Sequence, residues 1–205
     1  MVIGMEQAAE VLRAGGALIF PTDTVWGIGV AVEHAKGTWE LSQAKGRAPE
    51  KPIAWLVGDK SALDAYGMDV PGYARRLADA FWPGPLTLVV WASREVPPAY
   101  IAADGTVGLR MPDSGCALAL ARAAGSPLAT TSANFAGDPA RPSSEPPDLQ
   151  FAESCDVPVL DARVKGGAGG AASAVVDCSG CEPRLLRAGT ISASEMQGAC
   201  GVPFL

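Results

Sequence analysis

Hydrophobic and polar positions follow two different periods along this chain, and together they predict a protein that mixes helices and strands. Apolar residues recur at helical spacing in some segments, while short apolar runs bounded by Gly or Pro are typical of buried strands. The expected helices are residues 6–12, 38–44, 61–66, 73–81 and 116–124. The expected strands are residues 17–20, 52–57, 86–91, 106–112, 157–160 and 173–177, with a further short strand beginning at Pro127.

The predicted strands share a second feature, because polar side chains follow them closely. Thr, Ser, Asn, Arg or Lys stands at or just after the end of most of these apolar runs. This arrangement is typical of an open α/β sheet with a polar cleft. We find no internal repeat and no clear linker, so the pattern predicts one domain over residues 1–205.

A basic segment separates the predicted helix 38–44 from the strand that follows it. Lys45, Arg47 and Lys51 lie within seven residues, and a glycine and two prolines keep the segment from being helical. In an extended stretch, residues two or six apart point the same way, so the three cations can converge. An arginine fork between two ammonium groups suits a polyphosphate. The alternative is a solvated basic loop before a buried strand.

Two further segments place polar groups at strand ends. Thr22, Asp23 and Thr24 come directly after strand 17–20, which is where ligands bind in open α/β sheets; a tight turn is the alternative. Arg110 ends the alternating segment 106–112. A charged group among buried strands needs a carboxylate or phosphate partner, so Arg110 is either a ligand-binding residue or half of a structural ion pair.

Composition and charge narrow the function. The chain is 48% hydrophobic and 19% charged, so it can bury a sizeable core, and its net charge of -6 argues against a broad non-specific grip on nucleic acid. No signal-peptide pattern and no apolar run long enough to span a membrane are visible, which favours the cytoplasm.

The cysteines favour the same compartment. Cys178 and Cys181 form a single C-x-x-C pair among five cysteines, and His34 is the only histidine. A zinc site needs a second pair or more histidines, so reduced thiols are expected, with a redox or metal-binding pair as the alternative.

The chain lacks the motifs of several common enzyme classes. It contains no P-loop, no G-x-G-x-x-G opening a helix, no G-x-S-x-G, no catalytic histidine pattern and no cluster of metal-binding carboxylates. Cations and hydroxyls without an obvious base indicate chemistry by positioning and charge stabilisation. Phosphoryl and nucleotidyl transfer work in this way.

Six segments together carry a resemblance to a known family. They are residues 21–29 (PTDTVWGIG), 45–52 (KGRAPEKP), 81–87 (FWPGPLT), 107–112 (VGLRMP), 131–134 (TSAN) and 173–177 (SAVVD) followed by Arg187. In this order they resemble the YrdC-type threonylcarbamoyl-AMP synthases, over residues 16–189. The resemblance implies an α/β domain with a twisted mixed β-sheet flanked by helices and a concave ligand cleft.

The resemblance also implies a reaction and its partners. Members of this family are nucleotidyltransferases that convert L-threonine, bicarbonate and ATP into threonylcarbamoyl-AMP and pyrophosphate, with Mg2+ held mainly by the ATP. The product feeds the threonylcarbamoyladenosine modification of tRNA, which a separate tRNA threonylcarbamoyl transferase complex completes. A weak contact with tRNA itself is also expected, and no metal ligand of the protein is expected.

The family's functional positions map onto this sequence residue by residue. The resemblance implies catalytic roles for Lys45, Arg47 and Lys51. It implies ATP contacts for Arg47, Lys51, Thr106, Ser132, Asn134 and Arg187, and threonine contacts for Thr24, Arg110, Thr130 and Ser173. By this mapping, Arg110 is expected to fork onto the threonine carboxylate and leave the amine free.

The chain departs from the family pattern at several positions. Leu56 stands where many relatives have a histidine near threonine, Ala174 replaces a threonine, and Ala140 replaces a serine near ATP. The glycine loop within residues 161–172 lacks the usual Asp-Gly-Gly lead. Two other functions stay open: a double-stranded RNA-binding module of the same fold without catalysis, and a carbamoyl-adenylate enzyme that uses carbamoyl phosphate.

Overall fold

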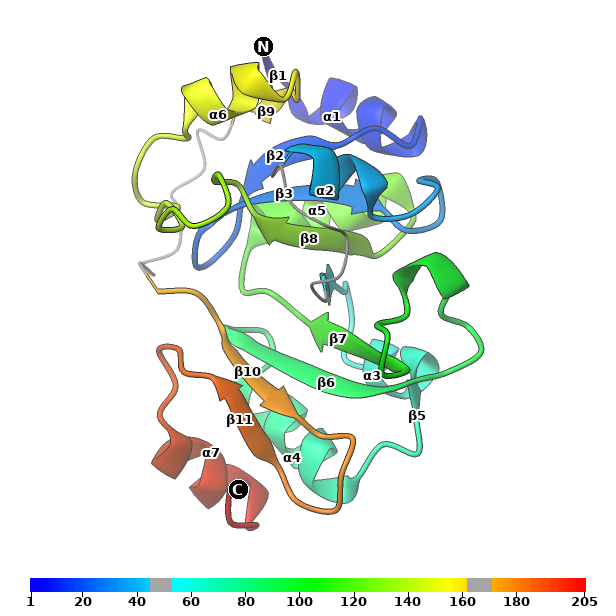
Figure 1. Ribbon diagram of the computed structural model, residues 1–205, viewed down its shortest axis with the longest axis vertical. Coiled ribbons are helices and arrows are strands. Elements are labelled where there is room, and N and C mark those ends of the chain that lie inside the picture. Colours follow the sequence, from blue (N-terminus) through cyan, green and yellow to red (C-terminus); the bar gives the residue numbers. More distant parts are fainter. Residues whose placement is uncertain (45–52, 162–170) are drawn as a thin grey trace.

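The computed structural model describes residues 1–44, 53–161 and 171–205, and its frame is one mixed β-sheet (Figure 1). The strands are β1 (Val2–Ile3), β2 (Leu18–Pro21), β3 (Trp26–Ala31), β4 (Ala54–Leu56), β5 (Gly67–Met68), β6 (Leu86–Ala92), β7 (Thr106–Arg110), β8 (Leu128–Ser132), β9 (Val159–Leu160), β10 (Ala174–Asp177) and β11 (Arg184–Arg187). The helices are α1 (Met5–Arg13), α2 (Trp39–Ala44), α3 (Ala62–Tyr66), α4 (Gly72–Phe81), α5 (Gly115–Ala124), α6 (Leu149–Ser154) and α7 (Ala193–Cys200), with a 3-10 turn over Pro98–Tyr100.

The sheet runs in the order β1-β9-β2-β3-β8-β4-β7-β6-β10-β11, and β5 pairs with the far part of β6. The parallel pairs are β1 with β9, β2 with β9, β4 with β7 and β6 with β10, and the other pairs are antiparallel. Strands from the two ends of the sequence thus meet in one sheet, because β9 pairs with β2 and β10 pairs with β6. The predicted mixed α/β fold is confirmed.

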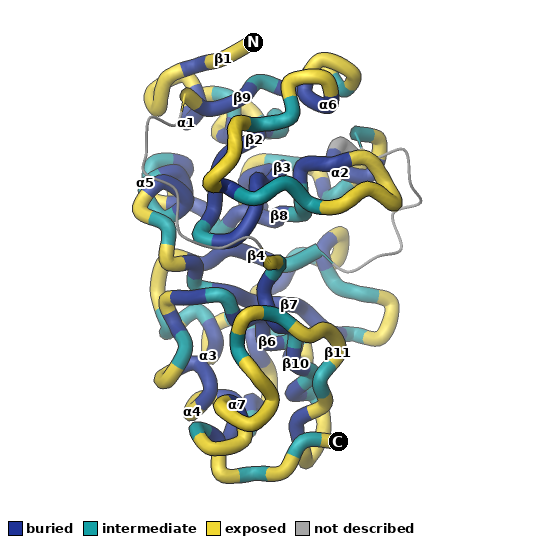
Figure 2. The backbone as a smooth tube through the Cα atoms, turned by 90° about the vertical axis from the view of Figure 1, so that its left-hand side faces the viewer, coloured by how far each residue is buried: buried dark blue, intermediate teal, exposed yellow. Residues whose placement is uncertain are grey.

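Helices cover both faces of the part of the sheet that contains β2, β3 and β8. Figure 2 shows α1 and α5 on one side of these strands and α2 and α6 on the other. Leu12 of α1 and Leu120 of α5 pack with Leu18, Phe20 and Leu128 in a core cluster without solvent exposure. Burial on both faces explains why β2 reads as a continuous apolar run and not as an alternating strand.

A second, larger core cluster extends from α2, α6 and β3 into the other half of the molecule, where α4 packs against β6 and α7 packs against α4 (Figure 1). Trp55 of β4 stands between the two halves and is fully buried. Tyr66 and Tyr100 pack edge-on against its indole, with ring centroids 5.1 and 5.7 Å away. Such edge-to-face pairs add stability beyond the apolar area they bury.

The expected helices and strands are confirmed to within a few residues, and the unpredicted elements have recognisable causes. Strand β3 was hidden in the Thr/Gly-rich segment after Pro21, because glycine is depleted in strands. Helix α6 lies in a part of the chain for which the sequence pattern predicted no helix or strand. Helix α7 begins with the Ser192–Glu195 capping box beyond the last motif.

The glycines of β3 are required by the close approach of β8. Gly29 pairs with Thr130 in the sheet. A Cβ at Gly29 would lie 2.7 Å from Thr130 Oγ1, 3.0 Å from the Ala129 carbonyl oxygen and 3.1 Å from Phe20 Cε1. A side chain at this position therefore displaces β8 or the ring of Phe20.

We expect Gly29→Ala to lower the free energy of unfolding by about 1–3 kcal/mol, because it overpacks a close-packed site. Urea unfolding measures this change. Gly115→Ala is the matched control, since a Cβ there meets nothing within 4 Å and the residue opens helix α5. Equal unfolding free energies for Gly29→Ala and the wild type would contradict the packing argument.

Candidate active site

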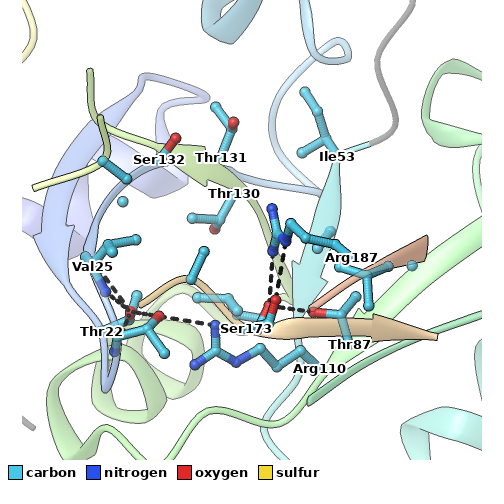
Figure 3. Close-up of a pocket in the computed structure, with 18 of the residues that line it drawn as sticks. Thr22, Val25, Ile53, Thr87, Arg110, Thr130, Thr131, Ser132, Ser173 and Arg187 are labelled. Carbon is cyan, nitrogen blue, oxygen red and sulfur yellow. Dashed lines mark hydrogen bonds between the residues drawn. The ribbon is translucent and has the colours of Figure 1, made fainter. Parts of the chain in front are cut away.

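A pocket of about 260 Å³ opens where the β2–β3 turn meets the strands of both halves of the sheet (Figure 3). Its volume is close to the lower end of the range of about 300–1,000 Å³ that is typical of small-molecule sites. The pocket is lined by Thr22, Thr24, Val25, Gly27, Ile53, Ala54, Leu56, Thr87, Val89, Gly108, Arg110, Thr130, Thr131, Ser132, Ala140, Ala172, Ser173, Val175 and Arg187.

The polar part of this lining is cationic and rich in hydroxyl groups. Arg110 and Arg187 are its charged members, and seven threonines and serines add hydroxyls. No carboxylate belongs to the lining formed by the described residues. A lining of guanidinium groups and hydroxyls favours an anionic ligand.

Arg110 is buried at the end of β7 and is held by three contacts. Its Nη2 donates to Asp23 Oδ1 at 2.6 Å, its Nη1 to Thr24 Oγ1 at 3.2 Å, and its Nε to the Gly84 carbonyl oxygen at 3.0 Å. The side chains of Arg110 and Asp23 are only 7% and 8% exposed. The structural ion pair that the sequence left open as an alternative is therefore present, on an arginine that also lines the pocket.

Thr22 organises the turn that carries Asp23 and Thr24. Its Oγ1 lies 2.8 Å from the Val25 carbonyl oxygen, to which it donates, and it accepts from the Thr24 and Val25 amides at 3.1 and 3.3 Å. The Thr22 and Thr24 hydroxyl oxygens are 3.1 Å apart. These bonds close the turn, and the Thr24 hydroxyl accepts from Arg110. Figure 3 shows Thr22 of this turn beside Arg110.

Arg187 enters the pocket from β11 and is anchored on Ser173. Its Nε donates to the Ser173 carbonyl oxygen at 3.0 Å and its Nη2 to Ser173 Oγ at 3.1 Å. Ser173 Oγ in turn lies 2.9 Å from Thr87 Oγ1 (Figure 3). Burial, together with the nearby positive charge of Arg110, lowers the pKa of Arg187 from its usual value. The two guanidinium groups thus belong to the lining of one pocket.

The structure brings six of the predicted site residues into one pocket. These are the four predicted threonine contacts and two of the predicted ATP contacts: Thr24, Arg110, Thr130, Ser173, Ser132 and Arg187. They come from the β2–β3 turn, from β7, β8 and β11, and from the residue before β10. Residues more than 160 positions apart in the sequence thus share one cavity.

Other predicted residues are not among those that line the pocket. Thr106 stands at the opposite end of β7 from Arg110, and its hydroxyl donates to Asp104 Oδ1 at 2.7 Å. The Asn134 amide donates to the carbonyl oxygens of Phe135 and Asp138 and so orders the loop after β8. The ATP contacts of Thr106 and Asn134 stay predictions.

The predicted catalytic cations, Lys45, Arg47 and Lys51, lie outside the described residues, as does the glycine loop at 162–170. Ile53 and Ala172, close in sequence to these two segments, both line the pocket. The roles of the three cations stay predictions.

Three departures from the family pattern fall at the pocket or beside it, and the fourth, in the glycine loop, lies largely outside the described residues. Leu56 and Ala140 both belong to the lining, so each presents a hydrocarbon side chain where the family pattern has a polar one. Ala174 is fully buried in β10, next to Ser173. The pocket thus keeps its arginines and loses hydrogen-bonding groups at its edges.

Sequence reasoning counted Thr22 and Asp23 among the polar groups at a strand end without giving either a partner, and it named no role for Thr87. All three belong to the motifs at residues 21–29 and 81–87, so the motifs pointed to the right segments. Their contacts join distant strands: Asp23 reaches Arg110, and Thr87 reaches Ser173. No sequence signal specifies such pairs.

The cysteines and possible metal ligands lie apart from this chemistry. All five cysteines are free; Cys178 is buried and Cys181 is exposed. Over the described ranges, no group of three or more His, Cys, Asp or Glu side chains is placed to hold a metal ion. No helix within those ranges is long and apolar enough to cross a membrane.

The comparison with protein families matches residues 10–189 to the Sua5/YciO/YrdC family, described as "Telomere recombination". This match covers most of the chain. The chain belongs to the Sua5/YciO/YrdC family. The predicted resemblance to YrdC-type proteins is confirmed.

Curated relatives in the family carry one activity in their names. A Mycobacterium tuberculosis protein named for threonylcarbamoyl-AMP synthesis is 36% identical over 199 residues, covering 97% of this chain and 90% of that protein. The threonylcarbamoyl-AMP synthase of Bacillus subtilis is 34% identical over 95% of this chain, which spans 56% of that longer protein. These names agree with the predicted synthase function and not with the RNA-binding alternative.

Solved structures agree with the fold of the family. The structure of Pyrococcus abyssi Sua5 complexed with L-threonine superposes with a TM-score of 0.87 at 30% identity, covering all of this chain and 62% of that one. The Escherichia coli YciO structure superposes with a TM-score of 0.79 at 24% identity over 94% of this chain and supports the fold alone.

The burial of the cysteines predicts an order of alkylation. Burial raises the pKa of Cys116 to about 11 and raises that of Cys178 as well, so at pH 8 both groups are protonated and poorly nucleophilic. We expect iodoacetamide at pH 8 to modify exposed Cys181 first and to reach Cys116 only after unfolding. Peptide mass spectrometry reports the order, and equally fast modification of Cys116 and Cys181 in the folded protein would contradict it.

Proposed function

We propose that this chain forms threonylcarbamoyl-AMP and pyrophosphate from L-threonine, bicarbonate and ATP. The observation that carries this proposal is the buried guanidinium of Arg110, held at the wall of a pocket that also contains Thr24, Thr130 and Ser173. The names of the curated relatives and the L-threonine complex of Pyrococcus abyssi Sua5 support it.

Threonine would bind through its carboxylate to Arg110. Nη1 and Nη2 of Arg110 each carry two hydrogens, of which the contacts to Thr24 and Asp23 use one each. The remaining hydrogens can take a carboxylate in the forked geometry that arginine favours. The ammonium group stays free of the arginine and releases a proton to solvent; the resulting amine then reacts with bicarbonate, which gives the carbamate and releases water.

ATP would occupy the part of the pocket near Ser132 and Arg187. A carbamate oxygen attacks the α-phosphorus of ATP, the bond to the bridging oxygen breaks, and pyrophosphate leaves. Arg187 offsets charge that grows on the phosphates, and the predicted cations Lys45, Arg47 and Lys51 would add to this effect. Holding three reactants side by side supplies much of the rate enhancement, so no strong protein base is required.

Mg2+ enters this proposal as part of the MgATP substrate. The described residues provide no cluster of carboxylates, histidines or cysteines for a resident ion. ATP supplies the phosphate oxygens that Mg2+ prefers. When bound there, Mg2+ neutralises phosphate charge, and the arginines of the pocket act on the charge that remains.

The product would leave for the tRNA modification that forms threonylcarbamoyladenosine, through the separate transferase complex. A reactive mixed anhydride of this kind needs a consumer close by, and a weak tRNA contact would serve that transfer. This pathway places the enzyme in the cytoplasm, which suits its free cysteines.

We expect pyrophosphate release from ATP in the presence of bicarbonate to depend on threonine. Serine, valine and a sample without amino acid are the comparison set, because they remove the methyl group, the hydroxyl group or the whole substrate. An enzyme-coupled pyrophosphate assay with purified protein measures the rates. No release with any amino acid would overturn the proposed function.

Replacing each pocket arginine by lysine should separate the two substrates. Arg110→Lys keeps the charge but loses the fork, so we expect KM for threonine to rise by roughly ten- to a hundredfold, with a smaller change in KM for ATP. Arg187→Lys should show the reverse pattern. Steady-state kinetics with each substrate varied in turn provides the measurement, and the same pattern for both variants would contradict the assignment.

A further inference from the structure

The carboxylate of Asp23 lies against Arg110, an arginine that lines the anion-binding pocket. A negative charge is unexpected at this position. Asp23 Oδ1 accepts from Arg110 Nη2 at 2.6 Å, while Asp23 Oδ2 is buried and has no hydrogen-bond partner within the described part of the chain. Buried carboxylates are normally satisfied at both oxygens, and each exception needs an explanation. A group kept only for stability would be better replaced by an apolar side chain.

The charges around the pocket suggest what Asp23 does. Arg110 and Arg187 both line the pocket, so two positive charges share one cavity. Burial first, and then the positive charge of Arg110, lowers the pKa of Arg187. Arg187 has no carboxylate at ion-pair distance in the described ranges, and its anchors are the neutral oxygens of Ser173. Asp23 therefore neutralises one guanidinium of the two and leaves the other with its full charge.

The two proposed substrates also differ in net charge, because one is neutral overall and the other is strongly negative. Threonine at neutral pH is a zwitterion without net charge, whereas the phosphate chain of ATP carries several negative charges. An arginine already paired with a carboxylate can still offer two hydrogens to a carboxylate by geometry. It attracts a polyanion much less, because the attraction depends on the net local charge.

We propose that Asp23 is a positioning and specificity-determining residue, which fixes the Arg110 guanidinium for an amino-acid carboxylate and prevents phosphate groups from occupying that end of the pocket. This inference rests on the proposed function. Asp23 acts through Arg110, since Asp23 itself is not part of the pocket lining. The contact of Arg110 with Thr24 holds the same guanidinium from a second side.

The test is competition between inorganic phosphate and threonine for the protein without ATP. Calorimetric titration of threonine is carried out at rising phosphate concentrations with the wild type and with Asp23→Asn, which is nearly isosteric and removes the charge. In the wild type we expect phosphate to leave the apparent threonine Kd nearly unchanged. In Asp23→Asn we expect it to raise that Kd by about tenfold or more, because an extra unit of positive charge favours a dianion over a zwitterion.

Asp177→Asn is the matched control. Asp177 also accepts from an arginine, Arg184 at 3.0 Å, and it does not line the pocket. The same substitution there should leave threonine binding insensitive to phosphate. A general loss of stability would affect thermal melting in either variant but would not create competition by phosphate.

A second variant keeps the proposal testable if Asp23→Asn does not fold. Asp23→Glu retains the charge and moves the carboxylate, so it should weaken threonine binding without making phosphate a competitor. Competition by phosphate in Asp23→Glu, or its absence in folded Asp23→Asn, would overturn this inference and leave the proposed function intact. Failure of the wild type to bind threonine or to release pyrophosphate with it would overturn the proposed function and this inference with it.

Discussion

The bond between Asp23 and Arg110 connects parts of the sheet that are not neighbours. Asp23 belongs to the turn before β3 and Arg110 ends β7, and two strands, β8 and β4, separate β3 from β7 in the sheet. The bond therefore spans the hollow over β8 and β4 and holds the β2–β3 turn against the end of β7. Breaking a buried pair of this kind is strongly destabilising, by about 3–5 kcal/mol, because one charge is left unpaired. The same contact that shapes the pocket thus also contributes to its rigidity.

A second constraint comes from the spacing of backbones below the pocket. Gly27 and Gly29 of β3 let Thr130 of β8 approach without a Cβ in the way, and Thr130 then lines the cavity. Gly189 plays a similar part near β10, where a Cβ would collide with the backbone of Ser173 and Ala174. These glycines are therefore required by the close approach of neighbouring backbones and not by loop flexibility.

Much of the fold could be predicted because its signals are local. The apolar run at 86–91 and the helical spacing at 73–81 correspond to β6 and α4, with bounds that differ by one residue at most. Strand β3 could not be predicted in this way, because its glycines have a reason only when β8 lies beside it. Helix α7 had a local signal in the Ser192–Glu195 capping box, which lies C-terminal to the six family-like segments.

The candidate site also combines residues that the sequence could indicate with contacts that only the fold reveals. Arg110 stood out because a charged group among strand residues needs a partner, and Arg187 was implied by the family resemblance; both line the pocket. The sequence left open whether the partner of Arg110 is a ligand or a carboxylate. The answer depends on where the β2–β3 turn lies, and spacing along the chain does not specify that position. Asp23 thus emerges as the partner only from the fold, together with the link from Thr87 through Ser173 to Arg187.

An acidic protein that binds polyphosphates must concentrate positive charge at its binding site, and this pocket does so. The net charge of -6 repels nucleotides at long range, so binding depends on the few arginines and lysines that reach the cleft. If every one of them were unpaired, phosphate would compete for every anion position, including the one that must take a carboxylate. One buried acid beside one arginine divides the pocket into a nearly neutral end and a positive end, and this division matches the different net charges of an amino acid and a nucleotide.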